Sequence, residues 1–145
     1  MIDITEITIT NWRECIALSV SPAQRSFVAT NLYSLAESKF EPDMCPVGLI
    51  ENNKLVGFAM YSYDSNESKS WIIRFMIDQA YQRKGLGTEA LRKLIALLAD
   101  KYPQSDIRLC VEPDNAVAIK MYKSFGFQPT GEKWDNELIF ELKKN

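Results

Sequence analysis

The stretch from residue 70 to residue 98 constrains the fold most, because it predicts a strand, a tight loop and a helix in direct succession. The segment SWIIRFMID is rich in β-branched and aromatic residues, which is typical of a buried strand. Further on, Leu91, Leu94 and Leu98 recur at helical spacing and form one apolar face. Glycines at positions 85 and 87 stand where the helix should begin, although glycine stabilises helices poorly. The succession predicts an α/β fold whose loop needs a bare backbone.

Strand and helix patterns continue on both sides of this stretch, without repeats or linkers, so we expect one domain over residues 1–145. The expected strands are 2–8, 46–51, 55–64, 70–78, 106–112 and 137–143, with a short extra strand near 128–134. The expected helices are 11–20, 21–40, 88–98 and 115–126. The second should start at Ser21 and Pro22, residue types that favour a helix start. This order predicts a mixed α/β domain with helices on both faces of a central sheet.

The absence of histidine excludes Ser-His-Asp and Cys-His catalysis, and it excludes metal sites built on histidine. Cys15, Cys45 and Cys110 are odd in number and scattered, which predicts reduced thiols in a cytosol and no zinc cage. The net charge of −2 gives no strong attraction to nucleic acid or to an anionic membrane. No apolar run approaches the ~20 residues of a membrane span, and the acidic start MIDITEITIT does not fit a signal peptide. We therefore expect a cytoplasmic protein.

The loop at residues 82–88 has the chemistry of an anion site. The start of a helix leaves N–H groups without partners and carries partial positive charge, so anions bind there. Gly85 and Gly87 remove side chains, Arg83 and Lys84 add positive charge, and Thr88 adds a hydroxyl. The sequence therefore predicts a phosphate cradle between a strand and a helix.

Three kinds of phosphate loop compete for this segment. A nucleotide P-loop requires Gly-Lys-Ser/Thr, and Gly87 is followed directly by Thr88, so this reading fails. A dinucleotide fingerprint fits Gly85, Gly87 and Ala90, but residues 78–84 separate it from the strand and the chain is short for two such halves. The pattern Q/R-x-x-G-x-G/A is satisfied by Gln82, Arg83, Lys84, Gly85, Leu86 and Gly87.

A second motif, DNAVAIKMYKSFGF, follows the next expected strand. It matches N-x-x-A-x-x-x-Y-x-x-x-G-F at Asn115, Ala118, Tyr122, Gly126 and Phe127. With both motifs in order, residues 71–127 resemble the GNAT superfamily of N-acetyltransferases. The segments PVGLIENNKLVGFAMYSYD and RFMIDQAYQRKGLG look most like the bacterial spermine/spermidine acetyltransferases within it.

The resemblance implies a fold, a cofactor and a set of roles. The fold would be a single GNAT-like domain with a mixed, mostly antiparallel sheet, whose central strands 71–78 and 106–112 splay apart. Acetyl-coenzyme A (acetyl-CoA) would be the co-substrate, with its pyrophosphate on residues 83–88 and its pantetheine arm in the gap. Backbone groups of Phe75, Met76 and Ile77 would hold that arm, with Asn115 and Ala118 of the second motif beside it. Tyr122 would protonate the departing thiolate, and the family's frequent dimers suggest a homodimer.

The proton acceptor stays open at this point. Many family members carry a carboxylate on the strand before the glycine loop, and residues 71–77 contain none. Glu112 is the first candidate and Asp78 the second, with a water relay equally plausible. Asn115 and Asp114 have a rival role as helix caps. Arg83 stands where the family often has glycine, which raises the question of whether it crowds the pyrophosphate.

The acceptor is expected to be a small primary amine, with spermine or spermidine as the first choice. Glu37, Glu41 and Asp43 form an acidic cluster that is either a solvated surface or an attraction for a cationic amine. Arg74 either pairs with an acid at the sheet margin or meets a substrate carboxylate. Aromatic residues that either pack or line the acceptor cleft are Tyr33, Phe40, Tyr61 and Tyr63. The alternatives are acetylation of a protein amine or an antibiotic amine, a non-catalytic acyl-CoA-binding domain, and a dinucleotide-binding module.

Overall fold

The computed structural model describes residues 1–144 and is built on one seven-stranded sheet with the order β1-β2-β3-β4-β5-β7-β6. The strands are β1 (Asp3–Glu6), β2 (Cys45–Glu51), β3 (Lys54–Asp64), β4 (Lys69–Ile77), β5 (Asp106–Val111), β6 (Gln128–Trp134) and β7 (Glu137–Leu142). Five of the six neighbouring pairs are antiparallel, and only β4 and β5 run parallel. The prediction of a mixed, mostly antiparallel sheet is confirmed, and so is the short extra strand that is now β6.

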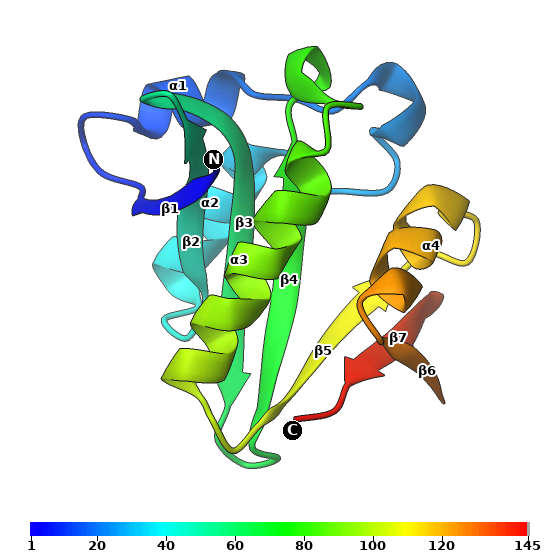
Figure 1. Cartoon of the computed structure of the whole chain (residues 1–145). Helices are drawn as coiled ribbons and strands as arrows, with labels where there is room; N and C mark the ends of the chain where they lie inside the picture. Colours follow the sequence, from blue (N-terminus) through cyan, green and yellow to red (C-terminus); the bar gives the residue numbers. More distant parts are fainter. Residues whose placement is uncertain (145) are drawn as a thin grey trace.

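Helices cover both faces of the sheet, as predicted. They are α1 (Trp12–Ala17), α2 (Asn31–Phe40), α3 (Leu86–Lys101) and α4 (Ala116–Ser124), with 3-10 turns at Pro22–Gln24 and Gln79–Tyr81. The apolar stripe of α3 packs in one cluster with Tyr122 of α4 and Phe140 of β7. Cys15 of α1 packs in a separate cluster with Phe58 of β3 and Met76 of β4. Figure 1 shows α3 crossing the near face of the sheet and α2 behind it.

The two central strands separate soon after they meet. β4 and β5 pair only from Lys69↔Asp106 to Ile72↔Leu109. Beyond that point β4 continues to Ile77 in partnership with β3 alone. Figure 1 shows the result as a V whose arms are β4 and β5, with α4 beyond the upper end of β5. The expected splay is therefore present.

Three predicted helix boundaries were wrong. Residues 21–40 do not form one helix: a 3-10 turn ends at Gln24, and α2 begins only at Asn31. The Thr30 hydroxyl accepts the Tyr33 N–H at 3.1 Å, which gives α2 its own start. The first helix ends at Ala17, before Val20. Helix α3 begins at Leu86, two residues before Thr88, because left-handed Gly85 (φ 77°) is its N-cap.

Across residues 1–144, no helix combines the length and the apolar character that crossing a bilayer requires.

Candidate active site

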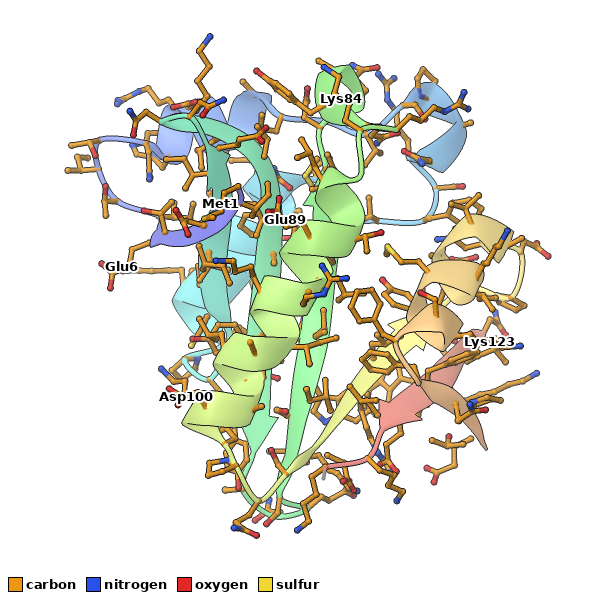
Figure 2. All side chains as sticks on the ribbon, in the orientation of Figure 1. Met1, Glu6, Lys84, Glu89, Asp100 and Lys123 are labelled. Atoms are coloured by element: carbon orange, nitrogen blue, oxygen red, sulfur yellow. The ribbon has the colours of Figure 1, made fainter. Side chains whose placement is uncertain are left out.

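The opening between β4 and β5 leads into a cleft of about 2140 Å³. Figure 2 shows side chains of α3 and α4 projecting toward each other across this part of the molecule. The cleft is lined by most of the predicted site residues: Phe75, Met76, Ile77, Gln82, Arg83, Gly85, Gly87, Thr88, Glu112, Asn115, Ala118 and Tyr122. Lys84 and Leu86 do not line it. Segments far apart in the sequence thus meet around one space.

The open edge of β4 offers backbone groups to this cleft. The Asp78 N–H donates to the Val56 carbonyl at 2.8 Å, so Asp78 turns its backbone toward β3. Because backbone groups alternate along a strand, Met76 also faces β3, where its carbonyl oxygen abuts Gly57. Phe75 and Ile77 therefore face the gap. Of the three predicted backbone positions, Met76 is already engaged within the sheet.

The start of α3 carries three N–H groups that its own helix cannot satisfy. The Glu89 N–H donates to the Gly85 carbonyl at 3.2 Å and closes the first turn. Leu86, Gly87 and Thr88 come before Glu89 in the helix, so their N–H groups have no intrahelical acceptor. Within residues 1–144, no side chain caps this end of the helix. The 16-residue helix also directs its positive dipole end to this point, which favours an anion.

Gly87 leaves an opening that the protein does not fill. A Cβ placed there would lie 3.8 Å from Ile77 Cγ1 and 3.9 Å from Met121 Sδ, which are ordinary contacts. A Cβ at Gly85 would meet nothing within 4 Å, although its φ of 77° favours glycine. Packing therefore does not require glycine at position 87. The bare backbone there fits the close approach of a phosphate group.

The polar side chains of the loop differ in whether they contact the protein or face the cleft. Gln82 is engaged internally, since its Nε2 donates to Gln24 Oε1 at 2.9 Å and to the Ile77 carbonyl at 2.8 Å. Lys84 lies over the Tyr81 ring at 5.7 Å, at the upper end of the loop in Figure 2. Arg83 is exposed, lines the cleft and has a φ of 62°, a left-handed conformation in which glycine would be unstrained. Of the two basic residues in the loop, Arg83 is therefore the one that lines the cleft.

Asn115 and Tyr122 lie on α4, on the far side of the gap. Asn115 Oδ1 accepts the Ala118 N–H at 3.3 Å, so Asn115 caps α4, which was the alternative role predicted for it. Its amide nitrogen has no acceptor among residues 1–144 and can still donate to a ligand. Tyr122 is 8% exposed and packs edge-on to Phe127. Burial raises the pKa of Tyr122 to about 12, so the phenol keeps its proton at neutral pH.

The carboxylates separate into structural and cleft-facing groups. Asp78, the second candidate base, accepts the Ser19 N–H at 2.8 Å and the Ala80 N–H at 3.1 Å, and it does not line the cleft. Glu112 is half-buried and lines the cleft. Glu137 also lines it and was not among the residues predicted from the sequence. Its signal was the alternation in ELIFEL, which sets glutamates 137 and 141 on one face of β7.

Acidic side chains outnumber basic ones around the cleft, among the residues that the structure describes. Seven carboxylates and two guanidinium groups line the whole cleft: Glu37, Glu41, Asp43, Asp64, Glu112, Asp114 and Glu137, against Arg74 and Arg83. Arg74 donates to Glu37 of α2 at 3.0 Å, so the expected pairing with an acid is present, although β4 is a central strand and not the sheet margin. The Arg74 charge is therefore largely offset, and the part of the cleft away from the glycine loop favours a cation.

Only one of the four aromatic residues considered for the acceptor cleft lines it. Tyr63 does so, and its ring stacks on Tyr102 with centroids 4.3 Å apart. Tyr61 is buried in the core, where packing explains it. Tyr33 and Phe40 lie outside the cleft and are exposed on α2.

Two of the cysteines, Cys45 and Cys110, line the cleft. Burial, followed by the charge of Glu137, raises the pKa of Cys110 to about 11. The thiol is therefore protonated at neutral pH and is a poor nucleophile. Cys110 therefore offers no activated thiol to the cleft.

Comparison with known proteins identifies relatives of the whole chain. The model of the acetyltransferase (GNAT) family matches residues 6–127. The spermine/spermidine N(1)-acetyltransferase of Bacillus subtilis (strain 168) is 38% identical over 137 residues, covering 90% of each chain.

Two solved structures share the fold. The aminoglycoside acetyltransferase AAC(6')-Ib in complex with coenzyme A superimposes with a TM-score of 0.81 at 17% identity, covering 100% of this chain and 95% of that one. The PaiA N-acetyltransferase of Thermoplasma acidophilum in complex with coenzyme A superimposes with a TM-score of 0.74 at 18% identity, covering 99% of both chains.

Proposed function

Because the chain belongs to the GNAT acetyltransferase family and is an acetyl-CoA-dependent N-acetyltransferase, we propose that its acceptor is a polyamine such as spermine or spermidine. The charge of the cleft carries this proposal. Seven carboxylates line it, and one of its two guanidinium groups is paired within the protein. A small cation with several ammonium groups matches that surface, as does the activity named for the B. subtilis relative.

The glycine loop is the proposed seat of the cofactor's pyrophosphate. The N–H groups of Leu86, Gly87 and Thr88 would donate to it, and the exposed Arg83 would supply a positive charge. The bare backbone at Gly87 supports this fit, because a Cβ there would make only ordinary contacts with Ile77 and Met121. Lys84 would act only through its charge, and Gln82 would hold the loop in place through its bonds to Gln24 and Ile77.

The splayed strands are the proposed seat of the cofactor arm. Phe75 and Ile77 would offer backbone groups from β4, and the Asn115 amide nitrogen would donate from α4, beside Ala118. One of the β4 N–H groups facing the gap would also stabilise the negative charge that develops on the acyl oxygen.

Tyr122 is the proposed acid. Bound acetyl-CoA supplies an acyl group on a thioester whose sulfur leaves as a thiolate. The Tyr122 phenol lines the cleft and is protonated at neutral pH, since burial raises its pKa to about 12. It can therefore donate a proton but cannot serve as the base. Another group receives the proton of the amine: Glu112, which lines the cleft, is the first candidate, and a water relay is the alternative.

A thiol-release assay over a panel of amines tests the acceptor. The panel holds spermine, spermidine, n-butylamine, a peptide with an N-terminal alanine and an aminoglycoside. We expect the largest kcat/KM for the polyamines, and a KM that rises with ionic strength because salt screens the acidic cleft. The single charge of n-butylamine should give weaker binding.

Charge variants sharpen the test. Glu41→Gln should raise the KM for spermine and leave the KM for n-butylamine nearly unchanged, while Glu132→Gln, an exposed position outside the cleft, should alter neither. Preference for the peptide or the aminoglycoside would contradict a polyamine acceptor. Tight acetyl-CoA binding without turnover of any amine would favour a non-catalytic acyl-CoA-binding domain.

A further inference from the structure

Glu137 occupies a fixed position at the start of β7. Leu138 pairs with Val111 of β5, and Glu137 itself pairs with Trp134 of β6, so strands hold this position from both sides. Leu138 packs with the cluster under α3 and α4. Because side chains alternate along a strand, Glu137 faces the opposite side of the sheet. Glu137 and the α4 residue Tyr122 thus reach the cleft from opposite sides of the sheet.

Elimination among the seven cleft carboxylates leaves two. Glu41, Asp43 and Asp114 are exposed to solvent. Glu37 is paired with Arg74, and Asp64 accepts the N–H groups of its own turn. Glu112 and Glu137 are half-buried, and within residues 1–144 neither side chain has an ion pair or a hydrogen bond.

The surroundings favour Glu137 over Glu112 as the reactive group. Val111 of β5 pairs with Leu138, so Glu137 lies across from Glu112 on the same face of the sheet. Both side chains therefore lie beyond Leu109, the last residue of β5 that pairs with β4. Strands flank Glu137 on both sides, whereas Glu112 follows the end of β5, so Glu137 has the more firmly fixed backbone.

We propose that Glu137 takes the proton from the attacking amine, with Glu112 as the neighbour that adjusts its basicity. This inference rests on acetyl transfer to a primary amine and holds whichever amine is the acceptor. The ammonium gives one proton to a Glu137 oxygen, which frees the nitrogen lone pair. That pair forms the C–N bond as the C–S bond breaks, and Tyr122 gives its proton to sulfur. The nitrogen's second proton restores Tyr122, and Glu137 releases its own proton to solvent.

The protonation behaviour of Glu137 suits this role. Burial raises the pKa of Glu137, the charges of Glu112 and Asp135 raise it further, and Arg74 opposes them. A carboxylate whose pKa is nearer to the working pH is a better proton acceptor than an ordinary glutamate. Removal of the Glu112 charge should therefore make Glu137 a weaker base that ionises at lower pH.

Three variants test the assignment by kcat at saturating amine across pH, using the amine that the wild type acetylates fastest. Glu137→Gln should lower kcat at pH 7 by about 10²–10⁴-fold, the usual contribution of a positioned base. Glu137→Gln should also abolish the acidic limb of the plot of kcat against pH, so that kcat rises steadily with pH up to the pKa of the amine. Glu112→Gln should shift that limb to lower pH with a much smaller loss. Glu132→Gln, exposed on the same hairpin, is the matched control and should behave like the wild type.

A second readout does not depend on turnover or on the acceptor. Carboxyl ¹³C NMR of the free protein should show Glu137 titrating above the ordinary glutamate range, with a lower midpoint in Glu112→Gln. The dissociation constant of acetyl-CoA should be the same in all variants. The inference is overturned if Glu137 titrates normally, or if Glu137→Gln keeps kcat within about threefold of the wild type. It is also overturned if Glu112→Gln shows the larger loss, which would make Glu112 the base. Failure of polyamines in the amine panel would refute only the proposed acceptor.

Discussion

Replacing Glu141 with glutamine should destabilise the protein, because this carboxylate joins three strands at the closed end of the V. It accepts from Arg108 Nε at 2.6 Å, from Lys69 Nζ at 2.9 Å and from Lys143 Nζ at 2.7 Å. Lys69 also donates to Asp106 at 2.8 Å, so the cluster links β4, β5 and β7. Glu141 is only 7% exposed. Glutamine in its place would remove the negative charge that pairs with these cations in a poorly solvated site.

The magnitude follows from the protonation of Glu141. Burial alone would raise its pKa, but hydrogen bonds from Lys143, Arg108 and Lys69 outweigh burial and lower it from 4.5 to about 2. A lowered carboxyl pKa gives stability that is present above pH 4.5 and is lost as the pH falls toward 2. At about 1.4 kcal/mol for each pKa unit, the charged form stabilises the fold at pH 7 by about 3 kcal/mol. Glu141→Gln should therefore lower the melting temperature by about 6–12 °C.

Urea denaturation of the wild type and Glu141→Gln at pH 7 and pH 3 checks this value. The difference in unfolding free energy should be about 3 kcal/mol at pH 7 and about half of that at pH 3, where the unfolded carboxyl is already protonated. Glu6→Gln, an exposed change on β1, serves as the control and should cost little. A difference below about 1 kcal/mol at pH 7, or one that does not shrink in acid, would refute the reasoning.

Two further predictions concern the cleft. Gly87→Glu should weaken acetyl-CoA binding by about 100-fold, because two unit charges about 5 Å apart repel by about 3 kcal/mol at an effective dielectric constant of 20. Ala96→Glu, on the exposed face of α3, is the matched control. If calorimetry showed equal affinities for acetyl-CoA, the result would argue against the phosphate cradle. Tyr122→Phe should lower kcat by at least about 100-fold without changing the dissociation constant of acetyl-CoA; steady-state kinetics with unchanged kcat across pH would remove Tyr122 as the acid.

The features that sequence could predict are those with a local signal. The glycine loop, the apolar stripe of α3 and the Asn115-to-Phe127 spacing each lie within one short segment, and each proved to belong to the expected element. The motif glycine Gly126 follows the last helix with a left-handed φ of 101°. Backbone geometry of this kind is set by neighbouring residues in the sequence, so it can be predicted from one amino-acid sequence.

The features that sequence could not predict depend on distant contacts. Asp78 ends a strand, and nothing nearby distinguishes a base from a structural residue; the Ser19 N–H, 59 positions away, engages it. Glu137 is assigned to the cleft only by the pairing of β7 with β5. The break before α2 likewise depends on Thr30, because Ser21 and Pro22 start only a single 3-10 turn. Local propensity favoured a continuous helix, and tertiary structure overrode it.

The short pairing of β4 with β5 explains how one sheet can be both stable and open. Lys69, Asp106, Arg108 and Glu141 tie the strands together where they pair, so no bonds are needed between the arms above Leu109. The gap then exposes backbone groups of β4, the start of α3 and Tyr122 on one side. Glu137 and the acidic acceptor surface meet it from the other side. In the proposed reaction, the cofactor and the amine therefore approach from opposite sides, which keeps the acid near the leaving sulfur and the base near the entering nitrogen.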